Sequence, residues 1–117
     1  MSEHHKINYI EIPTRDIERT KTFFLHVFDW CFTDYGPDYC TIDNASVDGG
    51  FFSSDKTVST KTGSVLVVLY SDDLEKSVEK VLEHGGRIIA PTFSFPGGSR
   101  FHFSDPTGNE FAVWTKD

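Results

Sequence analysis

The chain has 117 residues, of which 38% are hydrophobic, 25% are charged and 15% are aromatic. This length and composition are typical of one globular domain that builds its core without disulfides. Eleven Lys and Arg against 18 Asp and Glu give a net charge of −7, which argues against nucleic-acid and membrane partners. No apolar run reaches the ~18 residues of a membrane span, and the opening residues lack the order of a signal peptide, so we expect a cytoplasmic protein.

The first half of the chain predicts a strand, a helix and three further strands. Alternating apolar residues indicate a strand over residues 7–13, and Asp16 can cap a helix over residues 17–29. Short strand candidates follow at residues 31–35, 39–42 and 47–53, and a polar linker follows at 55–62.

The second half repeats this order. An offset of 57 residues places Asp16 on Asp73 and Ile17 on Leu74, so Asp73 is expected to cap a second helix. The pattern predicts a strand at 65–70, a helix at 74–84 and strands at 87–95, 100–104 and 110–115.

The repeat predicts an α+β fold. We expect a single domain over residues 1–117, built from paired βαβββ modules at about 6–54 and 63–116. Each helix covers one face of its sheet, so the remaining faces are expected to form two facing curved mixed sheets around a cup. Side chains alternate along a strand, which places Tyr9 and Glu11 on the cup side of the first strand.

Four stretches of the chain carry a family resemblance. They are YIEIPTRDIERTKTFF (9–24), VFDW (27–30), VVLYSDDLEKSVEKVLEHGG (67–86) and FHFSDPTGNEFAVW (101–114). With them the sequence resembles the vicinal oxygen chelate superfamily of glyoxalase I, bleomycin-resistance proteins and extradiol dioxygenases over nearly its whole length. It looks most like the small branch described as "predicted enzyme related to lactoylglutathione lyase". This fold hosts many reactions, so the resemblance implies the fold more strongly than the chemistry.

The resemblance also implies where a metal would bind. In the metalloenzymes of the superfamily, His and Glu side chains from the first and last strands of each half hold a divalent ion. Here the matching positions are Tyr9, Leu66, Ala112 and residues 50–52, which lack imidazole and carboxylate groups. We therefore expect no metal and no other cofactor, and neither a glyoxalase I nor an extradiol dioxygenase mechanism.

The remaining cup residues predict a pocket for a small molecule. Apolar and aromatic walls with a few polar groups are typical of such pockets, although the same side chains could instead fill a plain core. The candidate substrate-binding residues are Tyr9, Tyr39, Phe51, Leu66, Val68, Arg100, Ala112 and Trp114.

Glu11 and His102 are the candidate catalytic residues. Glu11 interrupts an apolar strand, and it is either a general base whose pKa is raised by apolar surroundings or a structural acid paired with Arg15, Arg100 or backbone donors. His102 could form an acid/base pair with Glu11 across the cup, or be an ordinary hydrogen-bonded strand histidine.

Two functions remain open from the sequence. One is a metal-independent lyase or isomerase that moves protons on a small substrate, and the other is a non-catalytic protein that binds or sequesters a small molecule, as resistance proteins do. The family that the chain resembles usually pairs its units edge to edge. Because an exposed sheet edge invites pairing, we also expect a homodimer.

Overall fold

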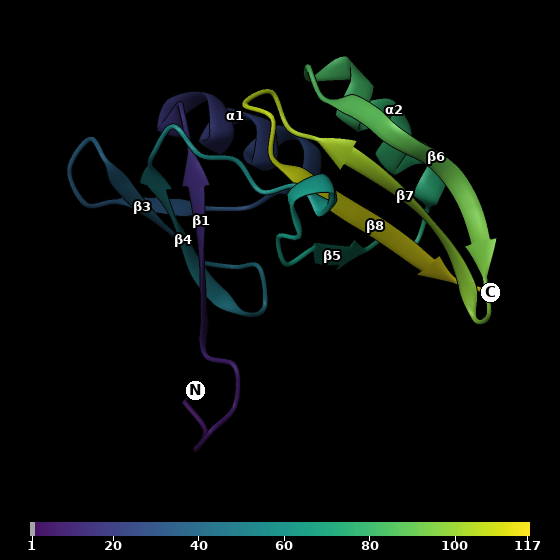
Figure 1. Ribbon diagram of the computed structural model, residues 1–117, viewed down its shortest axis with the longest axis horizontal. Helices are drawn as coiled ribbons and strands as arrows, with labels where there is room; N and C mark the ends of the chain where they lie inside the picture. Colours follow the sequence, from purple (N-terminus) through teal and green to yellow (C-terminus); the bar gives the residue numbers. More distant parts are fainter. Residues whose placement is uncertain (1) are drawn as a thin grey trace. The chain divides into compact units, whose positions relative to one another are not determined.

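The computed structural model describes residues 2–117 and divides them into two modules, one ending at Lys56 and one running from Thr57 to Asp117. Each module has one α-helix and one four-stranded sheet with parallel and antiparallel pairs (Figure 1). The predicted α+β class and the repeated βαβββ order are therefore confirmed. The facing of the two sheets around a cup stays a prediction. No helix among these residues is both long enough and apolar enough to cross a membrane.

The first module has the strand order β1-β4-β3-β2. β1 and β4 run parallel because α1 crosses between the beginning of the module and its meander, whereas the other pairs are antiparallel. The elements are β1 (Tyr9–Thr14), α1 (Ile17–Phe28), β2 (Phe32–Asp34), β3 (Tyr39–Ile42) and β4 (Asp48–Ser53).

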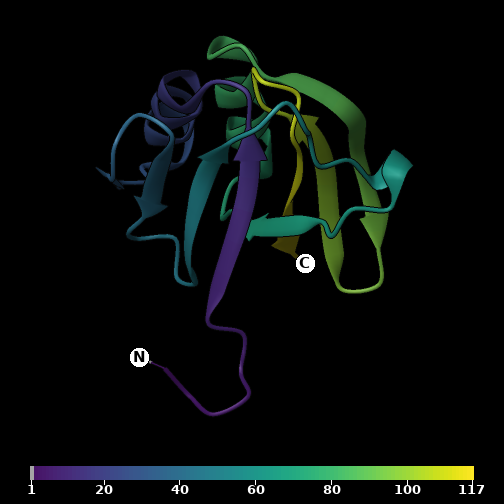
Figure 2. The same cartoon turned by 60° about the vertical axis from the view of Figure 1, so that its left-hand side comes forward.

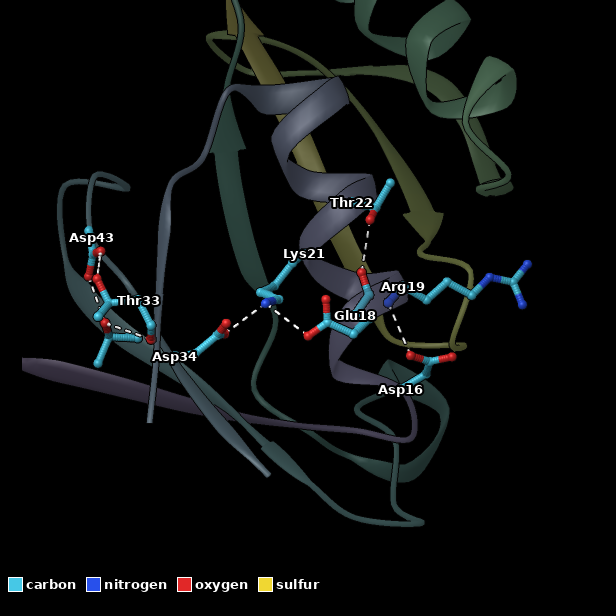
Figure 3. Close-up of polar contacts among 9 residues, drawn as sticks. Asp16, Glu18, Arg19, Lys21, Thr22, Thr33, Asp34 and Asp43 are labelled. Carbon is cyan, nitrogen blue, oxygen red and sulfur yellow. Dashed lines mark hydrogen bonds and ion pairs between the residues drawn. The ribbon is translucent and has the colours of Figure 1, made fainter. Parts of the chain in front are cut away.

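Both ends of α1 are capped, and the cap at its beginning is the one that the sequence predicts. The Asp16 side chain accepts a hydrogen bond from the Arg19 backbone N–H at 3.0 Å, which satisfies one of the free donors of the first turn (Figure 3). At the other end, Asp29 adopts a left-handed conformation with φ 59°, and its N–H donates to the Leu25 carbonyl at 3.0 Å. The helix therefore ends at Phe28.

An aromatic cluster joins α1 to its sheet. The fully buried ring of Phe24 lies 4.7 Å from that of Trp30 and 5.6 Å from that of Phe51, measured between centroids. Phe51 pairs with Ile12 in the β1–β4 register, and both residues are buried on the helix side. The expectation that Phe51 shares a face with Tyr9 is therefore wrong, because strand alternation carries it into the core.

The second module repeats the arrangement with the strand order β5-β8-β7-β6. β5 is parallel to β8, and β6 and β7 form a long antiparallel hairpin, seen in green in Figure 2. The elements are η1 (Thr60–Thr62), β5 (Val67–Tyr70), α2 (Leu74–Glu83), β6 (Arg87–Phe95), β7 (Gly98–Ser104) and β8 (Glu110–Lys116).

The core of this module lies between α2 and its sheet. The Asp73 side chain caps the helix by accepting from the Lys76 N–H at 3.1 Å. Every second residue of β7 and β8 faces the helix, among them the fully buried Phe101, Phe103 and Phe111, while the helix contributes Val81. The residues between them point to the opposite side, which we call the far face. It carries Arg100, His102, Glu110, Ala112 and Trp114.

A tight turn joins β7 to β8. The buried Asp105 accepts three hydrogen bonds at one carboxylate oxygen, from the backbone N–H and hydroxyl of Thr107 at 2.9 Å and from the Asn109 N–H at 3.0 Å. Gly108 has φ 99°, a conformation that glycine adopts without strain. The turn predicted from the DPTGN sequence is thus built around Asp105, which sets the register of β8.

The segment expected as a linker belongs mostly to the second module. Val58 donates its N–H to the Asn109 side chain at 2.9 Å and accepts from the Glu110 N–H at 3.0 Å. These bonds tie the segment to the first residue of β8. The unattached part of the predicted linker is therefore shorter than residues 55–62.

Candidate active site on the second module

A histidine and a carboxylate meet on the far face of the second sheet. His102 lies in β7 and pairs with Ala112, while Glu110 begins β8 and pairs with Ser104. His102 and Glu110 are therefore diagonal neighbours on one face, within side-chain reach. Nδ1 of His102 lies 2.9 Å from Oε2 of Glu110, and the two side chains are 12% and 3% exposed. Glu110 is not among the residues predicted from the sequence.

Thr60 provides further donors to this carboxylate. Its backbone N–H lies 2.8 Å and its hydroxyl 2.9 Å from Oε1 of Glu110. Burial opposes ionisation of Glu110, but the hydrogen bonds from His102 and Thr60 outweigh it and hold the pKa of Glu110 below its usual value. Glu110 is therefore an anion at neutral pH.

The ionised partner determines which nitrogen of His102 carries the proton. A carboxylate only accepts hydrogen bonds, so Nδ1 must donate to Glu110, and in the neutral ring Nε2 then carries a lone pair. Nε2 is buried and has no hydrogen-bond partner among the described residues. An oriented imidazole with a free lone pair is the arrangement of a general base.

Aromatic side chains and one cation surround the base. The centre of the Phe93 ring lies 5.9 Å from that of the His102 ring. The guanidinium carbon of Arg100 lies 5.4 Å from the centre of the Phe93 ring. Trp114 packs edge-on against Tyr70 at 5.0 Å. The far face therefore combines apolar aromatic surface with two polar groups, the imidazole of His102 and the guanidinium of Arg100.

The other predicted residues of this module have simpler surroundings. Ala112 is fully buried on the far face, and its partner Val68 in β5 is exposed. Leu66 is half-buried directly before β5. Their role in substrate binding stays a prediction.

The first module brings three of the predicted residues together. The Tyr39 hydroxyl donates to Oε2 of Glu11 at 3.1 Å and forms a hydrogen bond with the Tyr9 hydroxyl. Gly50 lies beneath the two hydroxyl groups, and a Cβ at this position would collide with that of Tyr39. Burial, followed by the hydrogen bonds to Tyr9 and Glu11, raises the pKa of Tyr39 well above its usual value.

This cluster changes the interpretation of Glu11. Glu11 is exposed, which differs from the first of the two alternatives for this residue, a general base in apolar surroundings. Its hydrogen-bond partner within the module is a phenol that remains protonated, so Tyr39 is a donor that holds Glu11 in place. The pairing of Glu11 with His102 stays a prediction.

The positions at which the superfamily binds a divalent ion do not fit one here. The Tyr9 hydroxyl is engaged with Tyr39, Gly50 has no side chain, and Leu66 and Ala112 are aliphatic. Divalent metals of this type need several imidazole or carboxylate ligands. Among residues 2–117, no three His, Cys, Asp or Glu side chains are grouped to hold a metal ion.

A separate surface cavity lies beside α1 in the first module. Nζ of Lys21 at its wall lies 2.7 Å from Asp34 and 2.9 Å from Glu18 (Figure 3). The hydrogen bonds to Asp34 and Glu18 raise the pKa of Lys21, so its charge is already neutralised by two carboxylates. The cavity has a volume of about 290 Å³ and is lined by Lys21, Thr22, Leu25, Trp30, Cys31 and Phe32.

Sequence comparison relates this chain to proteins of one family. The family model of the Glyoxalase/Bleomycin resistance protein/Dioxygenase superfamily matches residues 6–113. The chain is 30% identical to a glyoxylase-like domain-containing protein of Didymella fabae, over 97% of this chain and 95% of that protein. It is also 23% identical to a Mycobacterium bovis protein whose name includes glyoxylase, covering 92% of this chain but only 44% of that protein.

Solved structures share the fold at low sequence identity. A glyoxalase/bleomycin resistance protein/dioxygenase family enzyme from Burkholderia phytofirmans superposes with a TM-score of 0.79 at 18% identity, covering 96% of this chain and 99% of that one. The fosfomycin resistance protein FosX from Mesorhizobium loti gives 0.77 at 18% identity, covering 98% and 95%. The branch within the superfamily stays a prediction. From its sequence and its fold, the chain belongs to the glyoxalase/bleomycin resistance protein/dioxygenase superfamily.

Proposed function

We propose that this protein acts on a small molecule by proton transfer without a metal, as a lyase or isomerase, with His102 as the base. One observation carries the proposal. Nδ1 of His102 is held by the Glu110 carboxylate at 2.9 Å, while the opposite nitrogen is buried without a hydrogen-bond partner. A histidine in this state is prepared to accept a proton at Nε2.

The reaction follows from the two residues. Nε2 of His102 takes a proton from a substrate carbon next to a carbonyl group, the C–H electron pair forms a C=C bond, and the π pair of the carbonyl moves onto its oxygen to give an enolate. The Glu110 carboxylate stabilises the imidazolium that forms. Return of the proton to another carbon completes an isomerisation. In an elimination the enolate instead re-forms the carbonyl and expels a leaving group from the adjacent carbon, and the imidazolium gives its proton to that group.

A second candidate function is binding without chemistry. The Arg100 guanidinium and its aromatic neighbours form a surface suited to a small ligand, whether or not a proton moves. One structural relative is a fosfomycin resistance protein, FosX from Mesorhizobium loti. Sequestration of a small molecule is therefore the alternative against which proton transfer is tested.

Hydrogen–deuterium exchange distinguishes the two functions. The protein is incubated in D₂O with a panel of small aldehydes and ketones, and loss of the α-proton signals is followed by NMR. We expect exchange with at least one compound, at least ~100-fold slower in His102→Gln and ~10-fold slower in Glu110→Gln. The matched control His5→Gln changes an exposed histidine and should exchange like the unaltered protein. Binding without exchange would favour sequestration, and neither binding nor exchange would contradict both functions.

We also propose that the protein is a cytoplasmic homodimer. The edge strands of the two sheets are β1 and β2 in the first module and β5 and β6 in the second. Edge strands have unpaired backbone groups, which a second copy can pair. Sedimentation at micromolar concentration should give about twice the 13.3 kDa of one chain, and a mass of one chain would contradict the proposal.

A further inference from the structure

The far face of the second module places a guanidinium beside the base. Arg100 precedes His102 by two residues in β7, so their side chains leave the same side of the strand with about 6.7 Å between Cα atoms. In the neighbouring strands Arg100 pairs with Phe93 and Trp114. The cation Arg100 and the base His102 are therefore neighbours on this face, and aromatic side chains flank them.

Two phenylalanine rings hold the guanidinium. Its central carbon lies 5.4 Å from the centre of the Phe93 ring and 5.9 Å from that of Phe95. Phe95 in turn lies 6.2 Å from Trp114. Contacts of this kind orient the planar group without using its N–H donors, which stay available for hydrogen bonds.

The N–H groups of Arg100 lack an acceptor within the module. Nε is buried and has no hydrogen-bond partner among the described residues, and no carboxylate of the second module forms an ion pair with this side chain. The Glu110 carboxylate on the same face is already engaged by His102 and Thr60. A buried donor without an acceptor carries a free-energy cost, which a ligand that supplies an acceptor would remove.

We propose that Arg100 binds the carboxylate of a small monocarboxylic acid whose apolar or aromatic body packs against Phe93, Phe95 and Trp114. The fork of guanidinium N–H groups matches the two oxygens of a carboxylate. The inference rests on the proposed function, because the same ligand presents its C–H group to His102. It adds the substrate class, which the proposed function leaves open.

Binding measurements with matched probes test the substrate class. Benzoate, phenylacetate and 3-phenylpropionate vary the distance from the carboxylate to the ring, and the amide of each keeps the shape without the charge. We expect at least one acid to saturate in isothermal titration, with its amide binding at least tenfold more weakly. Arg100→Gln should weaken that acid at least tenfold and Arg100→Lys by less, because an ammonium keeps the charge but not the planar fork.

Controls separate this site from general attraction of anions. Arg87→Gln removes an exposed arginine from the same sheet and should leave the affinity within twofold. Inorganic phosphate should not displace the bound acid at equal concentration. Thermal melting of each variant checks that it folds.

Several results would overturn the carboxylate assignment: no binding of any of the three acids, equal affinity for acid and amide, full affinity in Arg100→Gln, or displacement by phosphate. His102→Gln keeps the anchor and should bind the acid within threefold of the unaltered protein. Binding without exchange therefore contradicts only the proton-transfer function, whereas exchange of the aldehydes and ketones with no acid binding contradicts only the role of Arg100.

Discussion

Nδ1 of His102 lies 2.9 Å from Oε2 of Glu110, and the two residues belong to neighbouring antiparallel strands. Both strands place a fully buried phenylalanine directly beside the pair in sequence, Phe103 and Phe111. Packing of these rings fixes the two strands, so the imidazole and the carboxylate are held by the sheet rather than by a loop. A site supported in this way keeps its geometry without a ligand.

Replacement of Glu110 with glutamine should destabilise the protein in a pH-dependent manner. The hydrogen bonds of the carboxylate to His102 and Thr60 are charge-assisted, so we expect a loss of about 2 kcal/mol at pH 7. The pKa of Glu110 is lowered by folding, and its stabilisation is therefore fully present above the unfolded value of 4.5. It is lost as the pH falls through the lower folded value. Urea unfolding between pH 3 and 7 measures the difference.

Glu79→Gln is the matched control, because Glu79 is exposed on α2. It should change the free energy of unfolding by less than about 0.5 kcal/mol across this range. A constant difference between Glu110→Gln and the unaltered protein at every pH would show that the charge of Glu110 does not stabilise the fold.

The neutral form of His102 should carry its proton on Nδ1. Ionised Glu110 can only accept a hydrogen bond, and this selects the tautomer with the free lone pair on Nε2. Long-range ¹H–¹⁵N correlation at pH 8 distinguishes the two ring nitrogens. Glu110→Gln should increase the share of the other tautomer, and an Nε2–H signal for His102 in the unaltered protein would contradict the assignment.

Tyr39→Phe should remove the last tyrosine to ionise. Burial and the hydrogen bonds to Tyr9 and Glu11 raise the pKa of Tyr39, because its phenolate would form in partly apolar surroundings beside a carboxylate. In a titration followed at the phenolate absorbance, the variant should lack the step at highest pH among the four tyrosines. Tyr35→Phe, at an exposed position, should instead retain that step.

Asp105→Ala should weaken the turn between β7 and β8. The substitution leaves two donors of Thr107 and the Asn109 N–H without their acceptor, and we expect a loss of about 2–4 kcal/mol in the free energy of unfolding. Asp105→Asn keeps a side-chain carbonyl and should cost less. A change below about 0.5 kcal/mol for Asp72→Ala, at an exposed position, would show that the effect is local.

The elements of the fold follow closely from local patterns in the sequence. Asp16 and Asp73 mark the two helix beginnings because each supplies an acceptor to the first turn, and the offset of 57 residues between them identifies the repeat. The positions at which helices and strands end were predicted less accurately. The first helix ends at Phe28 because Asp29 takes a left-handed conformation, which could not be predicted from the identity of this residue.

The site was predicted only in part, for reasons of register. His102 and Arg100 were selected because strand alternation places them away from the core phenylalanines. Glu110 was not selected, although the same alternation puts it on the face of Ala112, because a residue beside a turn looks exposed in sequence. The choice of Phe51 failed because its face depends on pairing with Ile12 in a strand far away in the chain.

The hydrogen bonds of Thr60 have a consequence for how this protein can vary. Connecting segments usually tolerate insertions and substitutions, because nothing in the packed structure depends on them. Here the exposed Thr60 is one contact away from the imidazole, through the carboxylate that both residues share. A substitution in this loop therefore changes how the Glu110 carboxylate is held, and with it the orientation of the His102 ring, without altering the sheet. A lineage of such proteins could tune its chemistry in a segment that looks like a spacer, fifty positions before the strand that carries Glu110.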